Sequence, residues 1–340
     1  MQHHKPCAFG FTVLLAFGTA AHGADLPKVA SGRIERMADF PSRQIPPRNV
    51  DVWLPDGYPK AAPYAVLYMH DGQMLFDATT TWNHQEWRAD EVAGELIAHG
   101  KTRPFIIVAI WNGGAARAAE YFPQKPLQEL ATKDRDELLA TTYGEGQKLF
   151  SGPVHSDRYL RFLVTELKPY IDSHFKVSAR REDTMLMGSS LGGLISMYAL
   201  AEYPKVFGAA ACLSTHWPGR MGDSLENPVP AAFFAYIGES FPKAGSHRIY
   251  FDHGTRTLDE SYADRQVVVD GLIRAKGYTD ADFMTRVFPG AEHRESAWAE
   301  RLSTPMTFLL GQPGRPSAGH GEETGPEEGP PGPRSLPGAQ

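Results

Sequence analysis

Cysteine is scarce in this sequence of 340 residues, which contains two, Cys7 and Cys212. Cys7 lies in an amino-terminal segment that we expect to be removed, so the mature chain cannot form an internal disulfide. Cys212 lies in the apolar stretch FGAAACLS and is expected to be a packed core thiol rather than a nucleophile. The fold must therefore be held together by its core rather than by covalent cross-links.

Long hydrophobic runs are also missing. The apolar run from Cys7 to Ala21 is shorter than the roughly 20 residues that a transmembrane helix needs. Because Lys5 precedes this run and small residues follow it, residues 1–23 are predicted to be a signal peptide cleaved after Gly23. We expect the chain to be exported, periplasmic or secreted, without stable membrane insertion after cleavage. An uncleaved membrane anchor is the alternative.

The sequence has no large excess of charge and no recognised metal-ligand motif. Its 34 Lys and Arg residues against 40 Asp and Glu residues give a net charge of −6, so no nucleic-acid partner is expected. His70, Asp71, His84 and His253 do not follow a spacing such as HExxH, so neither a metal nor a cofactor is expected. The pattern says nothing about oligomeric state.

Apolar side chains become rare after Gly311. Residues 312–340 consist mainly of Pro, Gly, Glu, Ser and Ala. Such a composition cannot bury enough apolar surface to offset the entropy of ordering the backbone. We therefore predict a disordered tail.

The rest of the chain alternates between short apolar runs and longer segments of helical periodicity. The predicted strands are Val50–Leu54, Tyr64–Met69, Phe105–Trp111, Thr184–Gly188, Gly208–Leu213, Arg248–Phe251 and Phe283–Phe288. The predicted helices are Glu86–His99, Asp157–His174, Leu191–Glu202, Tyr262–Lys276 and Arg294–Leu310. This alternation predicts one α/β domain over residues 24–311, a mostly parallel sheet with helices on both faces and ligand sites at the strands' carboxyl ends.

Two segments depart from this alternation. Gly32–Leu54 has no helical pattern and is expected to add antiparallel strands at the sheet edge. Ala115–Val154 is polar, with one helical piece around Leu127–Ala140, and resembles an insertion. It forms either a lid or substrate wall, or a solvated surface helix.

The hexapeptide Gly188-Ser189-Ser190-Leu191-Gly192-Gly193 lies between a predicted strand and a predicted helix. This is the pattern of a nucleophile elbow, where a tight, strained turn exposes a serine and glycines prevent backbone collisions. Ser190 is centred in the GxSxG pattern, whereas Ser189 has Met187 and Leu191 in place of the flanking glycines. We therefore predict Ser190 as the nucleophile.

A serine hydroxyl needs a histidine base and an acid that orients the base. His293 follows the strand Phe283–Phe288 and precedes the last helix, which is where the base of this fold comes in the chain. The acid is predicted to be Asp259, after the strand Arg248–Phe251 and the turn at Gly254. The alternatives are Asp252, Glu260 and Asp264, and Asp259 could also be a helix N-cap.

The developing oxyanion needs two backbone N–H donors. Leu191, the residue after the nucleophile, supplies one at the start of a helix. The second is expected after the strand Tyr64–Met69, in the loop His70-Asp71-Gly72-Gln73, where a glycine permits close approach of the backbone. Gln73 is the candidate donor.

These pieces together resemble the esterase D-like family of α/β-hydrolases, also described as "putative esterase". Its relatives include enterochelin esterases, feruloyl esterases, S-formylglutathione hydrolase and mycolyltransferases of the antigen 85 type. The matching motifs are VLYMHDGQMLFD, IIVAIWNGG, AAEYFP, GSSLGG, YFDHGTRTLDESY and FPGAEHRESAW, in this order from about Val50 to Leu310. The resemblance implies Ser190 as nucleophile, His293 as base and Gln73 as oxyanion donor. The family's acid follows a GTxD turn, which here is two residues longer.

The resemblance and the residues together predict a serine esterase that hydrolyses a carboxylic ester through an acyl-enzyme. The substrate is expected to be a small-molecule or glycan ester. The alternatives are an acyltransferase that uses the same triad and a non-catalytic relative that binds a siderophore or glycan. Aromatic residues near the predicted mouth are Trp82, Trp87, Trp111, Tyr121 and Trp217. Trp111 and Trp217 are the candidates for lining the substrate site, because they lie at or just past strand ends.

Overall fold

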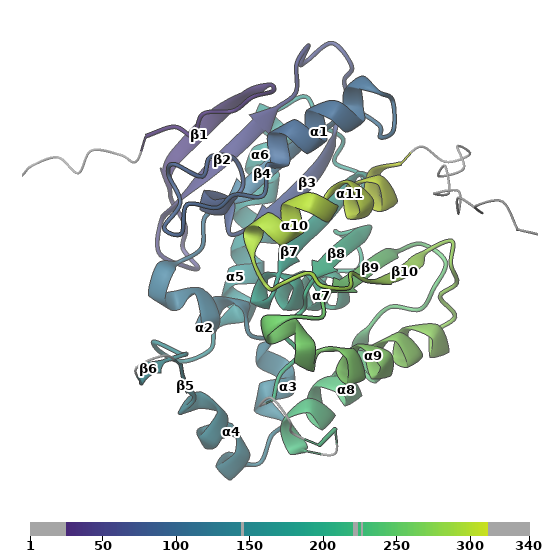
Figure 1. Cartoon of the computed structure of the whole chain (residues 1–340). Coiled ribbons are helices and arrows are strands. Elements are labelled where there is room, and N and C mark those ends of the chain that lie inside the picture. Colours follow the sequence, from purple (N-terminus) through teal and green to yellow (C-terminus); the bar gives the residue numbers. More distant parts are fainter. Residues whose placement is uncertain (1–24, 144–145, 220–223, 226, 312–340) are drawn as a thin grey trace, which may run out of the picture.

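The computed structural model describes residues 25–143, 146–219, 224–225 and 227–311, and Figure 1 shows their arrangement. The predicted signal peptide and the predicted tail lie outside these residues, so export and tail disorder stay predictions. Within the described ranges, no helix has the length and apolarity that crossing a bilayer requires.

One eight-stranded sheet runs through the described chain. Its strands are β1 (Arg33–Phe40), β2 (Arg48–Leu54), β3 (Ala65–His70), β4 (Phe105–Ile110), β7 (Thr184–Ser189), β8 (Ala209–Leu213), β9 (Arg248–His253) and β10 (Phe283–Val287). Their order in space is β1-β2-β4-β3-β7-β8-β9-β10. β2 pairs antiparallel with β1 and β4, and all other pairs are parallel. The predicted mostly parallel sheet with antiparallel strands at one edge is therefore confirmed.

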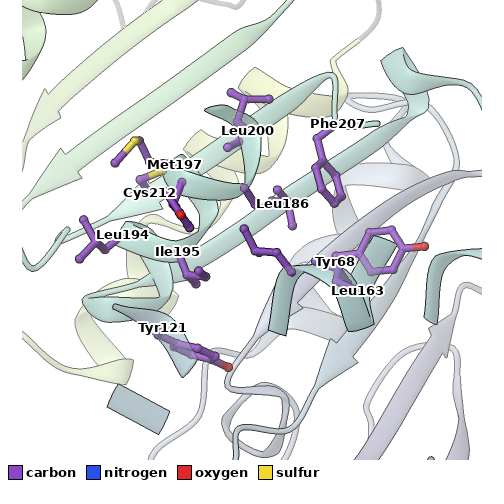
Figure 2. Close-up of a cluster of buried hydrophobic side chains, with 14 of the residues drawn as sticks. Tyr68, Tyr121, Leu163, Leu186, Leu194, Ile195, Met197, Leu200, Phe207 and Cys212 are labelled. Carbon is purple, nitrogen blue, oxygen red and sulfur yellow. The ribbon is translucent and has the colours of Figure 1, made fainter. Parts of the chain in front are cut away.

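Helices cover both faces of this sheet (Figure 1). One face carries α1 (Ala89–Ala98), α10 (Glu295–Arg301) and α11 (Ser303–Leu310), whereas the other carries α5 (Ser156–Phe162), α6 (Lys168–His174), α7 (Leu191–Glu202), α8 (Pro228–Ser240) and α9 (Ala263–Ala275). Successive strand residues point to opposite faces. Leu186 accordingly packs with the α7 side chains, as Figure 2 shows, whereas Met185 and Met187 join the cluster under α1, α10 and α11.

Three helices differ from the sequence prediction. The expected helix Asp157–His174 contains a π-helical turn, Leu163–Leu167, between α5 and α6. The expected last helix is divided into α10 and α11 at Leu302. The prediction missed α8, which opens with two prolines that are tolerated in a first turn, and the Asn227 side chain accepts the Val229 N–H there.

The inserted segment has two different parts. α2 (Arg117–Tyr121) is largely buried and packs on α5 and α7. The remainder contains α3 (Gln124–Gln128), α4 (Thr132–Leu139), β5 (Thr142–Tyr143) and β6 (Gln147–Lys148), and Figure 1 shows α4, β5 and β6 away from the sheet. α4 has no buried residue and is a solvated surface helix, whereas α3 buries Pro126 and Leu127.

The glycine at the end of β7 is required by a close backbone approach. A Cβ on Gly188 would lie 2.6 Å from the carbonyl carbon and oxygen of Gly192. We expect Gly188→Ala to lower the free energy of unfolding by about 1–3 kcal/mol, because backbone must move to make room.

The matched control is Gly271→Ala in α9, where an added Cβ meets nothing within 4 Å. This exchange should raise the free energy of unfolding by about 0.5–1 kcal/mol, since glycine is a poor helix former. Urea unfolding of both variants measures the difference. Equal effects would contradict the packing at the elbow.

Candidate active site

Ser190 occupies a sharp, strained turn between β7 and α7. Its backbone has φ 57° and ψ −125°, which is unusual for a residue with a side chain. Two hydrogen bonds pin the turn: the Ser190 N–H donates to the Leu213 carbonyl (2.9 Å), and the His216 N–H donates to the Ser190 carbonyl (3.2 Å). Ser190 is partly exposed whereas Ser189 is buried, so the turn presents the side chain that the pattern predicts.

His293 and Asp259 lie together in the structure. The distance between His293 Nδ1 and Asp259 Oδ1 is 2.6 Å, and Asp259 is 1% exposed. The other carboxylate oxygen accepts hydrogen bonds from Ser214 Oγ (2.6 Å) and from the Gly254 N–H. Burial opposes the charge of Asp259, but the hydrogen bonds from His293 and Ser214 outweigh it and lower its pKa. An ionised Asp259 fixes the proton of His293 on Nδ1 and leaves Nε2 as an acceptor.

Asp252, the leading alternative for the acid, has other partners. It is fully buried and accepts hydrogen bonds from Arg301 Nη2 (3.0 Å) and Nε (3.2 Å) and from Tyr250 Oη (2.9 Å). The same Arg301 Nη2 donates to Ser214 Oγ at 2.9 Å. Asp252 therefore anchors an arginine behind Ser214. The further alternatives, Glu260 and Asp264, are exposed.

The predicted oxyanion donors lie on two neighbouring helix starts. Leu191 N–H is the first of α7, and Gln73 is in the 3-10 helix η1 (Gly72–Met74) that follows β3. The opening N–H groups of a helix have no partner within it. Asp71 Oδ2 would lie 3.2 Å from a Cβ on Gly192, so the loop with Gln73 packs against the first turn of α7.

A partly buried ion pair holds this loop in place. Arg117 donates to Asp71 through Nε (2.7 Å) and Nη2 (2.8 Å), and Asn112 Nδ2 donates to Asp71 at 2.7 Å. The Asn112 N–H also donates to Gln73 Oε1 at 3.1 Å. Arg117 comes from α2, so the buried part of the inserted segment supports the predicted oxyanion loop.

Sequence reasoning missed His216, which lies beside the elbow. The His216 N–H donates to the Ser190 carbonyl, as described above, and His216 Nδ1 lies 2.9 Å from Tyr262 Oη. Burial, with contributions from His293, Arg117 and Arg265, lowers the pKa of His216 to about 4. His216 is therefore neutral at physiological pH. Its position just past the end of β8 is the signal in the sequence that could have identified it.

The two tryptophans predicted to line the substrate site lie in different surroundings. Trp217 is 2% exposed, and its Nε1–H donates to Gln266 Oε1 (3.1 Å), so it has almost no surface left for a substrate. Trp111 is partly exposed and lines a cavity near the end of β1 and the start of β2. Of the other aromatic residues considered, Trp87 and Tyr121 are buried and Trp82 is 82% exposed.

Potential metal ligands and the cysteine have structural surroundings. His70 Nδ1 lies 2.8 Å from Tyr159 Oη, and His253 Nδ1 lies near the Gly254 carbonyl. In the part of the chain that the structure describes, no group of three or more His, Cys, Asp or Glu side chains is arranged to hold a metal ion. Cys212 is fully buried (Figure 2), and burial raises the pKa of its thiol well above the usual value.

Comparison with known proteins gives one family match and several structural neighbours. Residues 46–309 match the family described as "Putative esterase". A ferulic acid esterase from Anaeromyces mucronatus superposes with a TM-score of 0.57 at 17% identity, covering 84% of this chain and 92% of that one. The IroE-like serine hydrolase of Shewanella oneidensis gives a TM-score of 0.56 at 20% identity over 82% of this chain and 79% of that one. These likenesses show an α/β-hydrolase fold, as predicted.

Curated relatives match over shorter stretches. The "Uncharacterized protein YbbA" of Bacillus subtilis is 22% identical over 161 residues, which cover 45% of this chain and 60% of that protein. The endo-1,4-beta-xylanase/feruloyl esterase of Xylanibacter ruminicola is 25% identical over 199 residues, which cover 56% of this chain and 23% of that protein. The match therefore spans less than two thirds of either relative.

The histidine beside the predicted oxyanion loop makes stability depend on pH. Burial lowers the pKa of His70 to about 4, from an ordinary value of 6.5. Between these values the unfolded chain binds a proton that the folded chain does not, so the free energy of unfolding falls as pH drops from about 6.5 to about 4. We expect His70→Gln to show a smaller fall in urea unfolding over this range. An unchanged pH dependence would contradict the burial of a neutral His70.

Proposed function

Because the chain belongs to the "Putative esterase" family of ester hydrolases, we propose that it cleaves a carboxylic ester with Ser190 as nucleophile, His293 as base and Asp259 as acid. The observation that carries this proposal is the pairing of His293 Nδ1 with the buried Asp259 carboxylate. β7, β8 and β9 are parallel neighbours, so their carboxyl ends lie on the same side of the sheet. The Ser190 turn follows β7 and Asp259 follows β9, on that side.

The first half of the reaction acylates Ser190. His293 Nε2 takes the hydroxyl proton as Ser190 Oγ forms a bond to the acyl carbon. The N–H groups of Leu191 and Gln73 stabilise the negative oxygen, and the ionised Asp259 stabilises the charged imidazole. The tetrahedral intermediate then expels the alcohol, which receives its proton from His293.

The second half returns the free enzyme. His293 Nε2 takes a proton from water as the water oxygen attacks the acyl carbon of the ester on Ser190. The same N–H groups stabilise the second tetrahedral intermediate. Its collapse breaks the bond to Ser190 Oγ, which regains the proton from His293, and releases the carboxylic acid. Each step uses side-chain and backbone groups of this chain.

The proposed substrate is a small-molecule or glycan ester. Proteins of this fold include a ferulic acid esterase and the enterochelin esterase of Shigella flexneri, which has a TM-score of 0.55 at 17% identity over 84% of this chain and 60% of that one. These names concern esters of ferulic acid and of enterochelin, cleaved by other proteins. They define which esters to test first on this chain.

Loss of either proposed reacting side chain should abolish ester hydrolysis. We expect Ser190→Ala and His293→Ala each to lower turnover on the order of 10⁴- to 10⁶-fold. The measurement is release of p-nitrophenol from acetyl and butyryl esters near pH 8 with a chelator present. Folding of each variant is checked by its unfolding curve. A Ser190→Ala protein that keeps its rate would contradict the proposal.

Amide substitution of the two buried aspartates should have different main effects, a lower kcat at Asp259 and a lower stability at Asp252. Asp259→Asn is expected to lower kcat on the order of 10²- to 10⁴-fold with a small loss of stability, because the imidazole loses its charged partner. Asp252→Asn leaves Arg301 without a buried counter-charge and should cost about 3–5 kcal/mol of stability, with a smaller effect on kcat.

Kinetics and urea unfolding of both aspartate variants, measured on the folded protein, make this comparison. Asp252→Asn is the matched control for a carboxylate-to-amide change in the same buried region. If Asp252→Asn lowered kcat more than Asp259→Asn, the assignment of the acid would be wrong.

A further inference from the structure

A cavity of about 230 Å³ lies at the antiparallel side of the sheet, apart from the residues that the proposed mechanism uses. Its wall comes from the end of β1, the start of β2, the turn after β4 and α2. The residues that matter for its chemistry are Asp39, Asn49, Trp111, Asn112, Gly113 and Glu120.

Hydrogen bonds and an arginine contact hold Trp111 in this wall. Its Nε1–H donates to Asp51 Oδ2 (2.9 Å), and the Arg36 guanidinium lies 4.8 Å from the centre of its ring. The backbone N–H of Trp111 donates to the Asn49 carbonyl (3.2 Å). The Arg36 guanidinium covers part of the ring, and Trp111, which stays partly exposed, lines the cavity as an apolar surface with little side-chain entropy left to lose.

The polar groups of the cavity suit hydroxyl groups rather than an ion. Glu120 is paired with Arg48 through two hydrogen bonds of 2.7 and 2.8 Å, so these two charges neutralise each other. A Cβ on Gly113 would lie 2.9 Å from Glu120 Oε2, so glycine keeps the turn close to the pair. Asp39 is exposed and, among the described residues, has no ion-pair partner. Asp39, Asn49 and Asn112 line the cavity together with Trp111. The Asn49 Oδ1 accepts the Asp39 N–H (3.1 Å), whereas the Asn112 amide donates to Asp71 and accepts the Gly114 N–H.

We propose that this cavity binds a sugar ring of a glycan ester, with Trp111 as the stacking surface and Asp39 and Asn49 as hydroxyl partners. An aromatic side chain in a cavity that Asp39 and Asn49 also line matches the two sides of a neutral sugar. One side of a sugar ring presents C–H groups, and its rim presents hydroxyl groups. The paired Arg48 and Glu120 give no net charge that would select an anion.

The position of the cavity connects it to the proposed catalytic site. Asn112 lines the cavity and also contacts Asp71 and Gln73 in the loop of the proposed oxyanion donor. In the sheet, β3 alone separates β4 from β7, so the ends of β4 and β7 lie roughly 10 Å apart at the usual strand spacing. A glycan whose ester is at Ser190 can therefore extend into the cavity, a link that rests on the proposed function.

The test measures saccharide binding without catalysis. The Ser190→Ala protein is titrated with xylotetraose, cellotetraose and maltotetraose, and binding is followed by saturation-transfer NMR and calorimetry. We expect at least one saccharide to bind saturably. Adding Trp111→Ala should weaken that binding about tenfold or more, which corresponds to about 1.4 kcal/mol, and Trp111→Phe should weaken it less.

Two further variants make the result specific. Trp82→Ala removes a tryptophan that is 82% exposed and lies outside the cavity, so it should leave the dissociation constant unchanged. Asp39→Gly removes the carboxylate at a backbone φ of 46° that glycine tolerates, and should weaken binding even if Trp111→Ala fails to fold.

The proposal is overturned if none of the three saccharides binds, if Trp82→Ala weakens binding as much as Trp111→Ala, or if ferulate binds in the cavity and the saccharides do not. Failure of the proposed hydrolysis would appear separately, as wild-type protein that binds a saccharide but releases no p-nitrophenol from the test esters.

Discussion

The buried hydroxyl of Ser214 joins the parts of the structure on which the candidate site depends. It donates to Asp259 Oδ2 and accepts from Trp298 Nε1 (3.0 Å) and Arg301 Nη2 (2.9 Å). A serine hydroxyl has one donor and two acceptor positions, and all are used here. The oxygen thereby connects the end of β8, the turn after β9 and helix α10, and these elements determine where the His293 loop lies.

Asp259, which follows β9, and Asp252, which lies within β9, have different roles around Ser214. Asp259 receives charge-assisted hydrogen bonds and stays ionised next to His293, whereas Asp252 neutralises the arginine that supports Ser214. A buried arginine without a counter-charge would be costly, so the Asp252 pair is a condition for placing a guanidinium so close to the site. On the other side of Ser190, the Asp71–Arg117 pair holds the Gln73 loop in a similar way.

Local patterns in the sequence predicted the sheet, because each core strand is a short apolar run that needs burial on both faces. They also predicted the Ser190 elbow, since its glycines and strand-to-helix position are adjacent in the chain. The acid stayed open among four residues, because strand and loop positions alone do not show which carboxylate faces His293. Ser214, His216 and Arg117 were not identified, because their importance comes from contacts with residues far away in the chain. Ser214 and Asp259 are 45 positions apart, and His216 and Tyr262, like Arg117 and Asp71, are 46 positions apart. α8 was missed because its prolines and aromatic residues hide a helical pattern.

Labelling with a fluorophosphonate followed by peptide mass spectrometry tests the central assignment most directly. The reagent forms a bond from phosphorus to an activated serine oxygen and releases fluoride. The account predicts one adduct, on Ser190 and not on the buried Ser189, that disappears in Ser190→Ala and forms far more slowly in His293→Ala. An adduct on a different residue, or undiminished ester hydrolysis by unlabelled Ser190→Ala protein, would contradict it.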